Sequence, residues 1–134
     1  MSTVGRYKTV QAETASPERL MMLLFERALA HMKSAQEAFA AGEESLAPRI
    51  ALTKAAEIVC ELNRTLDVEA AGALGETLKG VYDFVQEKVT VAALEGDADA
   101  LAEAARVFEP VVEAFREATG EAAAARPSGT GPVR

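Results

Sequence analysis

Six consecutive apolar residues, Leu20 to Phe25, constrain the fold of this chain more than any other feature. They follow Ser16 and Pro17, residue types that are typical of the N-cap and the first position of an α-helix. Because a helix completes a turn in about 3.6 residues, six apolar positions in a row cover its whole circumference. One side of such a helix can pack on neighbouring helices. The other side needs a second layer of helices or a binding partner.

The apolar pattern of the whole chain predicts an all-α protein, an antiparallel four-helix bundle joined by short connections. Alanine supplies 28 of the 134 residues and aromatic residues only 5%, a composition that favours helices over strands. The first helix should end near Gly42, and Gly120 should end the last one, which Asp97 or Asp99 caps. The second helix is expected to start around residues 46–48, the third to run from about 73 to 94, and the fourth to start after its cap at Asp97 or Asp99.

The chain divides into three expected segments. Residues 1–15 form a flexible N-terminal segment, in which Tyr7 and Val10 could dock on the bundle as a small amphipathic turn or remain mobile. Residues 16–120 form the bundle. Residues 121–134, rich in alanine, proline and glycine, form a disordered tail.

Three residues inside the helices are unusual for that position. Pro110 removes a backbone hydrogen bond and should kink the last helix. Gly75 and Gly80 each weaken the third helix by up to ~1 kcal/mol, and they can mark places where two helices approach closely.

The charge distribution excludes several kinds of partner. The net charge is −7, and all of it falls in residues 65–134, because the basic and acidic residues of 1–64 cancel. An acidic chain without a basic run is a poor candidate for binding nucleic acid or an anionic membrane. There is no apolar stretch of the length that a signal peptide or membrane span needs, and the single cysteine, Cys60, fits a reducing compartment. We therefore expect a cytoplasmic protein without membrane insertion.

No catalytic, cofactor or metal site is expected. The di-metal pattern of helical bundles needs two Glu-x-x-His motifs, and His31 is the only histidine. We expect His31 to be partly buried and hydrogen-bonded, and Cys60 to be an inert core residue. Glu57 and Glu61 lie one turn apart, and we expect them to lie on a solvated face of the helix.

Four stretches of the chain share the spacing of one known family. They are Tyr7 and Val10 followed by Thr14–Leu20 and Leu23–Leu29, then Lys54–Asp67, Leu78–Val85 and Phe115–Ala118. Together they resemble the FliS family of flagellar export chaperones over about residues 5–118. The chain departs from the family at Phe25, where tyrosine is usual, and in lacking a tryptophan near its end.

The resemblance implies a cytoplasmic four-helix bundle that binds the disordered C-terminal segment of flagellin. Binding would prevent premature polymerisation and assist delivery to the flagellar type III export gate, with the N-terminal segment covering part of the groove in the free protein. This agrees with the surplus apolar surface of the first helix, since a partner that orders on binding needs a large apolar surface to offset the ordering cost.

The residues that we expect to contact the partner come from the cover segment and from three helices. They are Tyr7, Val10, Met22, Phe25, Leu29, Leu62, Asn63, Leu66, Tyr82, Phe84 and Val89. Asn63 has two interpretations: it pairs with the backbone of the partner, or it caps the end of its own helix. The alternative function is a structural helical oligomer, such as a homodimer, or an adaptor for another amphipathic helix.

Overall fold

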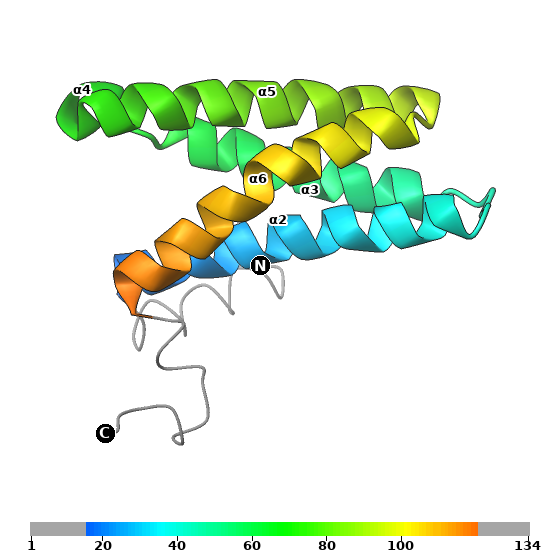
Figure 1. The fold of residues 1–134 in the computed structure, drawn as a ribbon, viewed down its shortest axis with the longest axis horizontal. Helices are drawn as coiled ribbons and strands as arrows, with labels where there is room; N and C mark the ends of the chain where they lie inside the picture. Colours follow the sequence, from blue (N-terminus) through cyan, green and yellow to red (C-terminus); the bar gives the residue numbers. More distant parts are fainter. Residues whose placement is uncertain (1–15, 121–134) are drawn as a thin grey trace, which may run out of the picture.

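The computed structural model describes residues 16–120, which form five helices and no strand (Figure 1). The helices are α2 (Pro17–Ala40), α3 (Ala47–Arg64), α4 (Val68–Ala71), α5 (Ala73–Glu95) and α6 (Ala98–Thr119). The four long helices form an antiparallel bundle in which α2 and α5 each pack on both α3 and α6. The all-α bundle expected from the sequence is therefore confirmed, and α4 is an additional single turn. Residues 1–15, with Tyr7 and Val10, and residues 121–134 lie outside the described residues.

The helix ends follow the expected capping residues. The Ser16 hydroxyl accepts a hydrogen bond from the Arg19 amide at 3.1 Å. The Asp97 carboxylate accepts one from the Ala100 amide, also at 3.1 Å. Gly120 adopts a φ of 80°, a conformation that side chains disfavour, and so ends α6. These local contacts explain why the boundaries of the long helices lie within a few residues of their expected positions.

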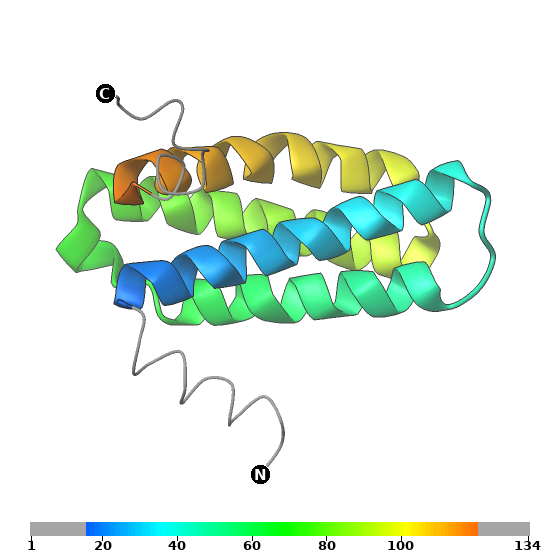
Figure 2. The same ribbon diagram turned by 90° about the horizontal axis from the view of Figure 1, so that it is seen from below.

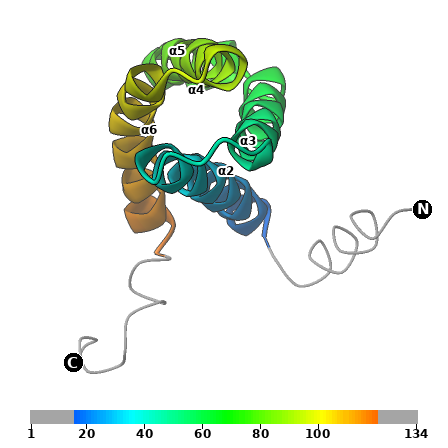
Figure 3. The ribbon, with the colours of Figure 1, turned by 90° about the vertical axis from the view of Figure 1, so that its right-hand side faces the viewer.

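The four long helices surround the axis of the bundle (Figure 3), and the core that they enclose includes Phe25. The Phe25 side chain is fully buried, and its ring centroid lies 4.8 Å from Phe115, 5.8 Å from Phe108 and 6.3 Å from Tyr82. Aromatic rings at such separations attract one another in addition to the apolar area that they bury. This cluster joins α2, α5 and α6.

Cys60 is exposed on α3, contrary to the expectation that it is a core residue. The buried positions of α3 include Ala55, Val59 and Leu62, which recur at intervals of three and four. Cys60 follows Val59 by one residue, a rotation of about 100° about the helix axis, and this turns it away from the core.

α6 passes through Pro110 as one continuous helix, from Ala98 to Thr119. The sequence predicts a kink at this residue, and the proline does not end the helix. Because Pro110 has no N–H group, the Arg106 carbonyl lacks its intrahelical donor. Both residues are exposed, so water can hydrogen-bond to that carbonyl. This hydrogen bond to water reduces the free-energy cost of a proline inside the helix.

Gly75 confirms the expected close approach, whereas Gly80 does not. A Cβ at position 75 would lie 2.6 Å from the Val68 carbonyl oxygen and 2.9 Å from the Ala71 Cβ, while one at position 80 would meet nothing within 4 Å. The first glycine therefore lets α4 fold back against the start of α5, and the second lies on an open surface.

This contrast predicts opposite effects of the same substitution. Gly75→Ala should lower the free energy of unfolding by about 1–3 kcal/mol, because the backbone of α4 must move. Gly80→Ala should raise it by about 0.5–1 kcal/mol, since alanine restricts the unfolded chain and favours the helix. Urea unfolding of both variants measures the two effects, and stabilisation by Gly75→Ala would contradict the packing of α4.

Candidate partner-binding surface

The residues expected to contact a partner fall into two groups in the structure. Six of them are buried in the core, whereas Asn63, Leu66 and Phe84 are half-buried. The buried six are Met22, Phe25, Leu29, Leu62, Tyr82 and Val89. Their side chains face the other helices, so a partner could touch them only if the helices moved apart.

Asn63 links α3 to α5. Its side-chain amide donates a hydrogen bond to Asp83 Oδ1 at 2.7 Å, and the Lys79 ammonium lies 3.2 Å from Asp83 Oδ2. These hydrogen bonds, that of Asn63 above all, lower the pKa of the Asp83 carboxyl. The C-cap of α3 is Thr65, so the side chain of Asn63 holds two helices together instead of capping its own.

An apolar surface runs along the sides of α5 and α6 that face each other. We call it the α5–α6 track; it comprises Val81, Phe84, Val91, Val107, Val111 and Phe115, all partly buried and packed against the core. The ion pair of Lys88 with Glu103, at 3.0 Å, identifies the facing sides, because Phe84 and Val107 lie one turn from these two charges. The Lys88 ammonium also lies 5.6 Å from the centre of the Phe84 ring.

A second incompletely covered surface lies at the start of α2. Within the run of six apolar residues, Met22 and Phe25 are buried, whereas Leu23 and Leu24 are half-buried and Met21 is 38% exposed. The surplus apolar surface expected of this helix is therefore present at its N-terminal end. That end lies at the same end of the bundle as the C-terminus of α6 (Figure 2).

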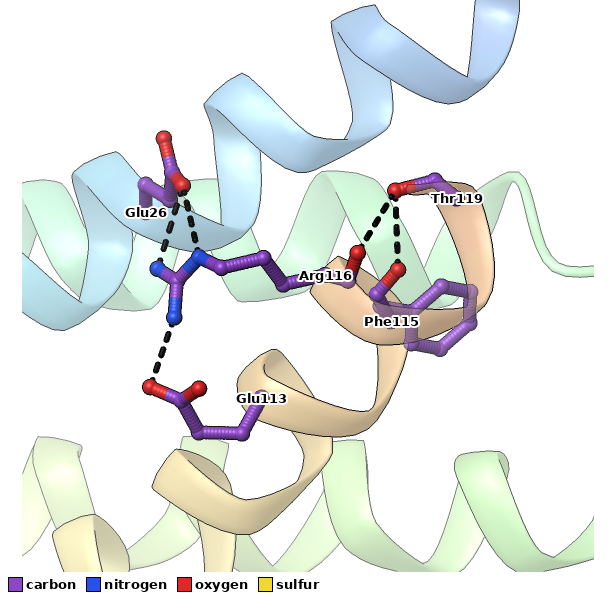
Figure 4. A network of polar contacts seen from close by, with 5 residues as sticks. All are labelled: Glu26, Glu113, Phe115, Arg116 and Thr119. Carbon is purple, nitrogen blue, oxygen red and sulfur yellow. Dashed lines mark hydrogen bonds and ion pairs between the residues drawn. The ribbon is translucent and has the colours of Figure 1, made fainter. Parts of the chain in front are cut away.

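Arg116 joins the end of α6 to α2 (Figure 4). Its Nη2 and Nε atoms lie 3.1 and 3.3 Å from Glu26 Oε2, and its Nη1 donates to Glu113 Oε2 at 2.6 Å. The side chain is only 23% exposed. The hydrogen bonds to Glu113 and Glu26 raise the pKa of the guanidinium above its ordinary value.

His31 is half-buried, as expected, but residues 16–120 offer its ring no hydrogen bond. Burial and the nearby charges of Lys54 and Arg27 lower its pKa, which favours the neutral form of the imidazole. Within residues 16–120 there is no cluster of three potential metal ligands. No helix among those residues is long and apolar enough to span a membrane.

Tyr82 provides a test of the core through its ionisation. Burial raises its pKa to about 12, compared with about 10 for an exposed tyrosine. Because the folded state holds the phenol proton more tightly, the stability that this adds is complete below pH ~10 and is lost as the pH rises towards 12. In a Tyr7→Phe variant, the tyrosinate absorbance should therefore appear near pH 12 in the folded protein and near pH 10 in urea. Ionisation at the same pH in both states would contradict the burial of Tyr82.

The arrangement of these residues defines a class of protein: a helical bundle with a long, partly covered apolar surface suited to holding another chain. The comparisons with known proteins specify the class further. The family model "Flagellar protein FliS" matches residues 1–122. The chain therefore belongs to the FliS family, which is a family of chaperones and not of enzymes.

Relatives in two bacteria align with most of the length of this chain. The flagellar secretion chaperone FliS of Campylobacter jejuni is 31% identical over 112 residues, covering 83% of this chain and 86% of the relative. That of Salmonella typhimurium is 29% identical over 126 residues, covering 90% and 93%. A bacterial flagellar chaperone of known crystal structure superposes with a TM-score of 0.67 at 15% identity, covering 90% of this chain and 99% of the other, and so shares the fold.

Proposed function

We propose that this protein is a cytoplasmic chaperone that binds the disordered C-terminal segment of flagellin. It keeps flagellin from polymerising before export and assists its delivery to the flagellar type III export gate. The observation that supports this proposal is the α5–α6 track, in which large apolar side chains along two packed helices are only partly buried. The relatives of the chain are named flagellar secretion chaperones, which supports a flagellar export substrate as the partner.

The track fits an amphipathic helix as its occupant. Phe84 and Val81 on α5 lie opposite Val107 and Val111 on α6, so apolar side chains one turn apart on a bound helix can insert between them. Each large side chain that becomes fully buried contributes about 1.5–3 kcal/mol. A few such anchors offset the several kcal/mol that ordering a disordered segment costs.

Other partly covered apolar side chains lie outside the track. Leu24 of α2 and Leu66, which follows α3, are partly buried and pack against the core, and Met21 at the start of α2 is 38% exposed. Asn63 holds α3 against α5, and its amide is already engaged with Asp83.

Calorimetric titration of the purified chain with the C-terminal segment of flagellin from the same genome tests the proposal. We expect saturable binding near one to one, a negative heat-capacity change and a gain in helicity. A variant lacking residues 1–15 distinguishes an absent site from one that this segment covers. Absence of binding at tens of micromolar by both proteins would contradict the proposal and favour the helical oligomer.

A further inference from the structure

α6 runs obliquely across the bundle, from α5 towards α2 (Figures 1 and 3). Glu103 pairs with Lys88 of α5, whereas Glu109 and Arg116, nearer the C-terminus, pair with Lys33 and Glu26 of α2. We call residues 111–119 the terminal section of α6. Residues 98–109 form the part of α6 that precedes Pro110.

Pro110 stands at the boundary between the two parts. Without an amide hydrogen it cannot donate to the Arg106 carbonyl, so one backbone bond that would couple the terminal section to the rest of α6 is missing. Pro110 and Arg106 are both exposed. Helices bend most readily at such positions.

Four side chains connect the terminal section to the bundle. Val112 is its one fully buried residue, Val111 packs partly buried against the core, and the half-buried ring of Phe115 lies 4.8 Å from the ring of Phe25. Arg116 forms an ion pair with Glu26, whose carboxylate is 41% exposed and therefore subject to screening by salt.

The terminal section is capped within itself. The Thr119 hydroxyl donates to the carbonyl oxygens of Phe115, at 2.9 Å, and Arg116, at 3.3 Å. Gly120 closes the helix with a positive φ. None of these capping contacts reaches another helix, so the section can move as one helical unit without losing them.

We propose that the terminal section of α6 is a hinged flap that turns about Pro110 and is latched to α2 by Arg116 and Glu26. When the flap opens, Phe25 loses the cover of Phe115 and Val112, and an apolar helix of the bound segment takes their place. This inference rests on the proposed function. Opening of the flap would make buried residues of the aromatic cluster part of the binding surface.

Hydrogen exchange of the full chain without a partner tests the flap. Glu26→Gln removes the charge of the latch and should lower the protection of amides 111–119 by roughly fivefold relative to those of 98–109. Pro110→Ala restores the missing backbone bond and should raise this relative protection by about tenfold. The matched control is Glu109→Gln, which removes the Lys33–Glu109 ion pair between the same two helices before the hinge and should leave the ratio unchanged.

Titration with the flagellin segment then connects the flap to binding. Pro110→Ala should slow association several-fold and Glu26→Gln should accelerate it, while Glu109→Gln behaves as the unmodified chain. If both variants exchange and bind as the unmodified chain does, the flap is overturned although the chaperone function stands. If the unmodified chain fails to bind, the proposed function is overturned, and the exchange ratios alone decide whether the flap exists.

Discussion

Replacing Phe25 with alanine is expected to lower the free energy of unfolding by about 3–5 kcal/mol. The side chain is fully buried and its ring contacts the rings of Tyr82, Phe108 and Phe115, so its removal leaves a cavity where three helices meet. Urea unfolding followed by circular dichroism measures the loss.

Met21→Ala is the matched control for this substitution. Met21 belongs to the same apolar run of α2 but is 38% exposed, so its truncation should change the free energy of unfolding by less than about 1 kcal/mol. Equal losses in the two variants would show that Phe25 does not occupy the centre of the core.

Replacing Phe84 with alanine should weaken binding of the flagellin segment by on the order of 30-fold, as for an aromatic anchor worth about 2 kcal/mol. Phe84 is half-buried at the middle of the α5–α6 track, where it packs on the core and approaches Lys88. The free energy of unfolding should fall by no more than about 2 kcal/mol, because part of the ring is already in water. Calorimetric titration of the folded variant measures the affinity.

Leu94→Ala controls for the loss of an apolar side chain from the same helix. Leu94 is 66% exposed and lies outside the track, so its variant should bind as the unmodified chain does. If Phe84→Ala also bound with unchanged affinity, the track would not be the surface that holds the partner.

The sequence predicts the fold well because its signals are local. Ser16 and Asp97 accept the first-turn hydrogen bonds expected of N-caps, and Gly120 ends the last helix. The single turn of α4 carried a similar signal: the Asp67 side chain accepts from the Ala70 amide at 3.1 Å, and Gly72 follows with a positive φ. Four residues are too few for a helical periodicity to appear.

The binding surface is harder to predict, because core and groove side chains recur with the same spacing. Tyr82 and Phe84 are both aromatic residues of α5, and the rotation of the helix buries the first and leaves the second half-exposed. In α6 the structure buries Val112 and leaves the neighbouring Val111 partly buried on the track. Only the packing of neighbouring helices decides between positions that differ by one residue.

The sequence also cannot show that α6 runs obliquely from α5 towards α2. Glu26 and Arg116 are 90 residues apart, and their pairing depends on the path of α6 across the bundle. Pro110 indicates where the helix is weak but not which contacts hold the turns beyond it. The helix continues through Pro110, and the tertiary contacts of Val112, Phe115 and Arg116 hold the turns beyond it on the bundle.

The central claim is that the α5–α6 track holds the flagellin segment, and a titration followed by methyl NMR tests it most directly. On addition of the segment, the methyl signals of Val81, Val107 and Val111 should shift, whereas those of Leu46 and Ile50, exposed at the start of α3, should stay in place. Shifts confined to the start of α3, with the track unaffected, would contradict the account.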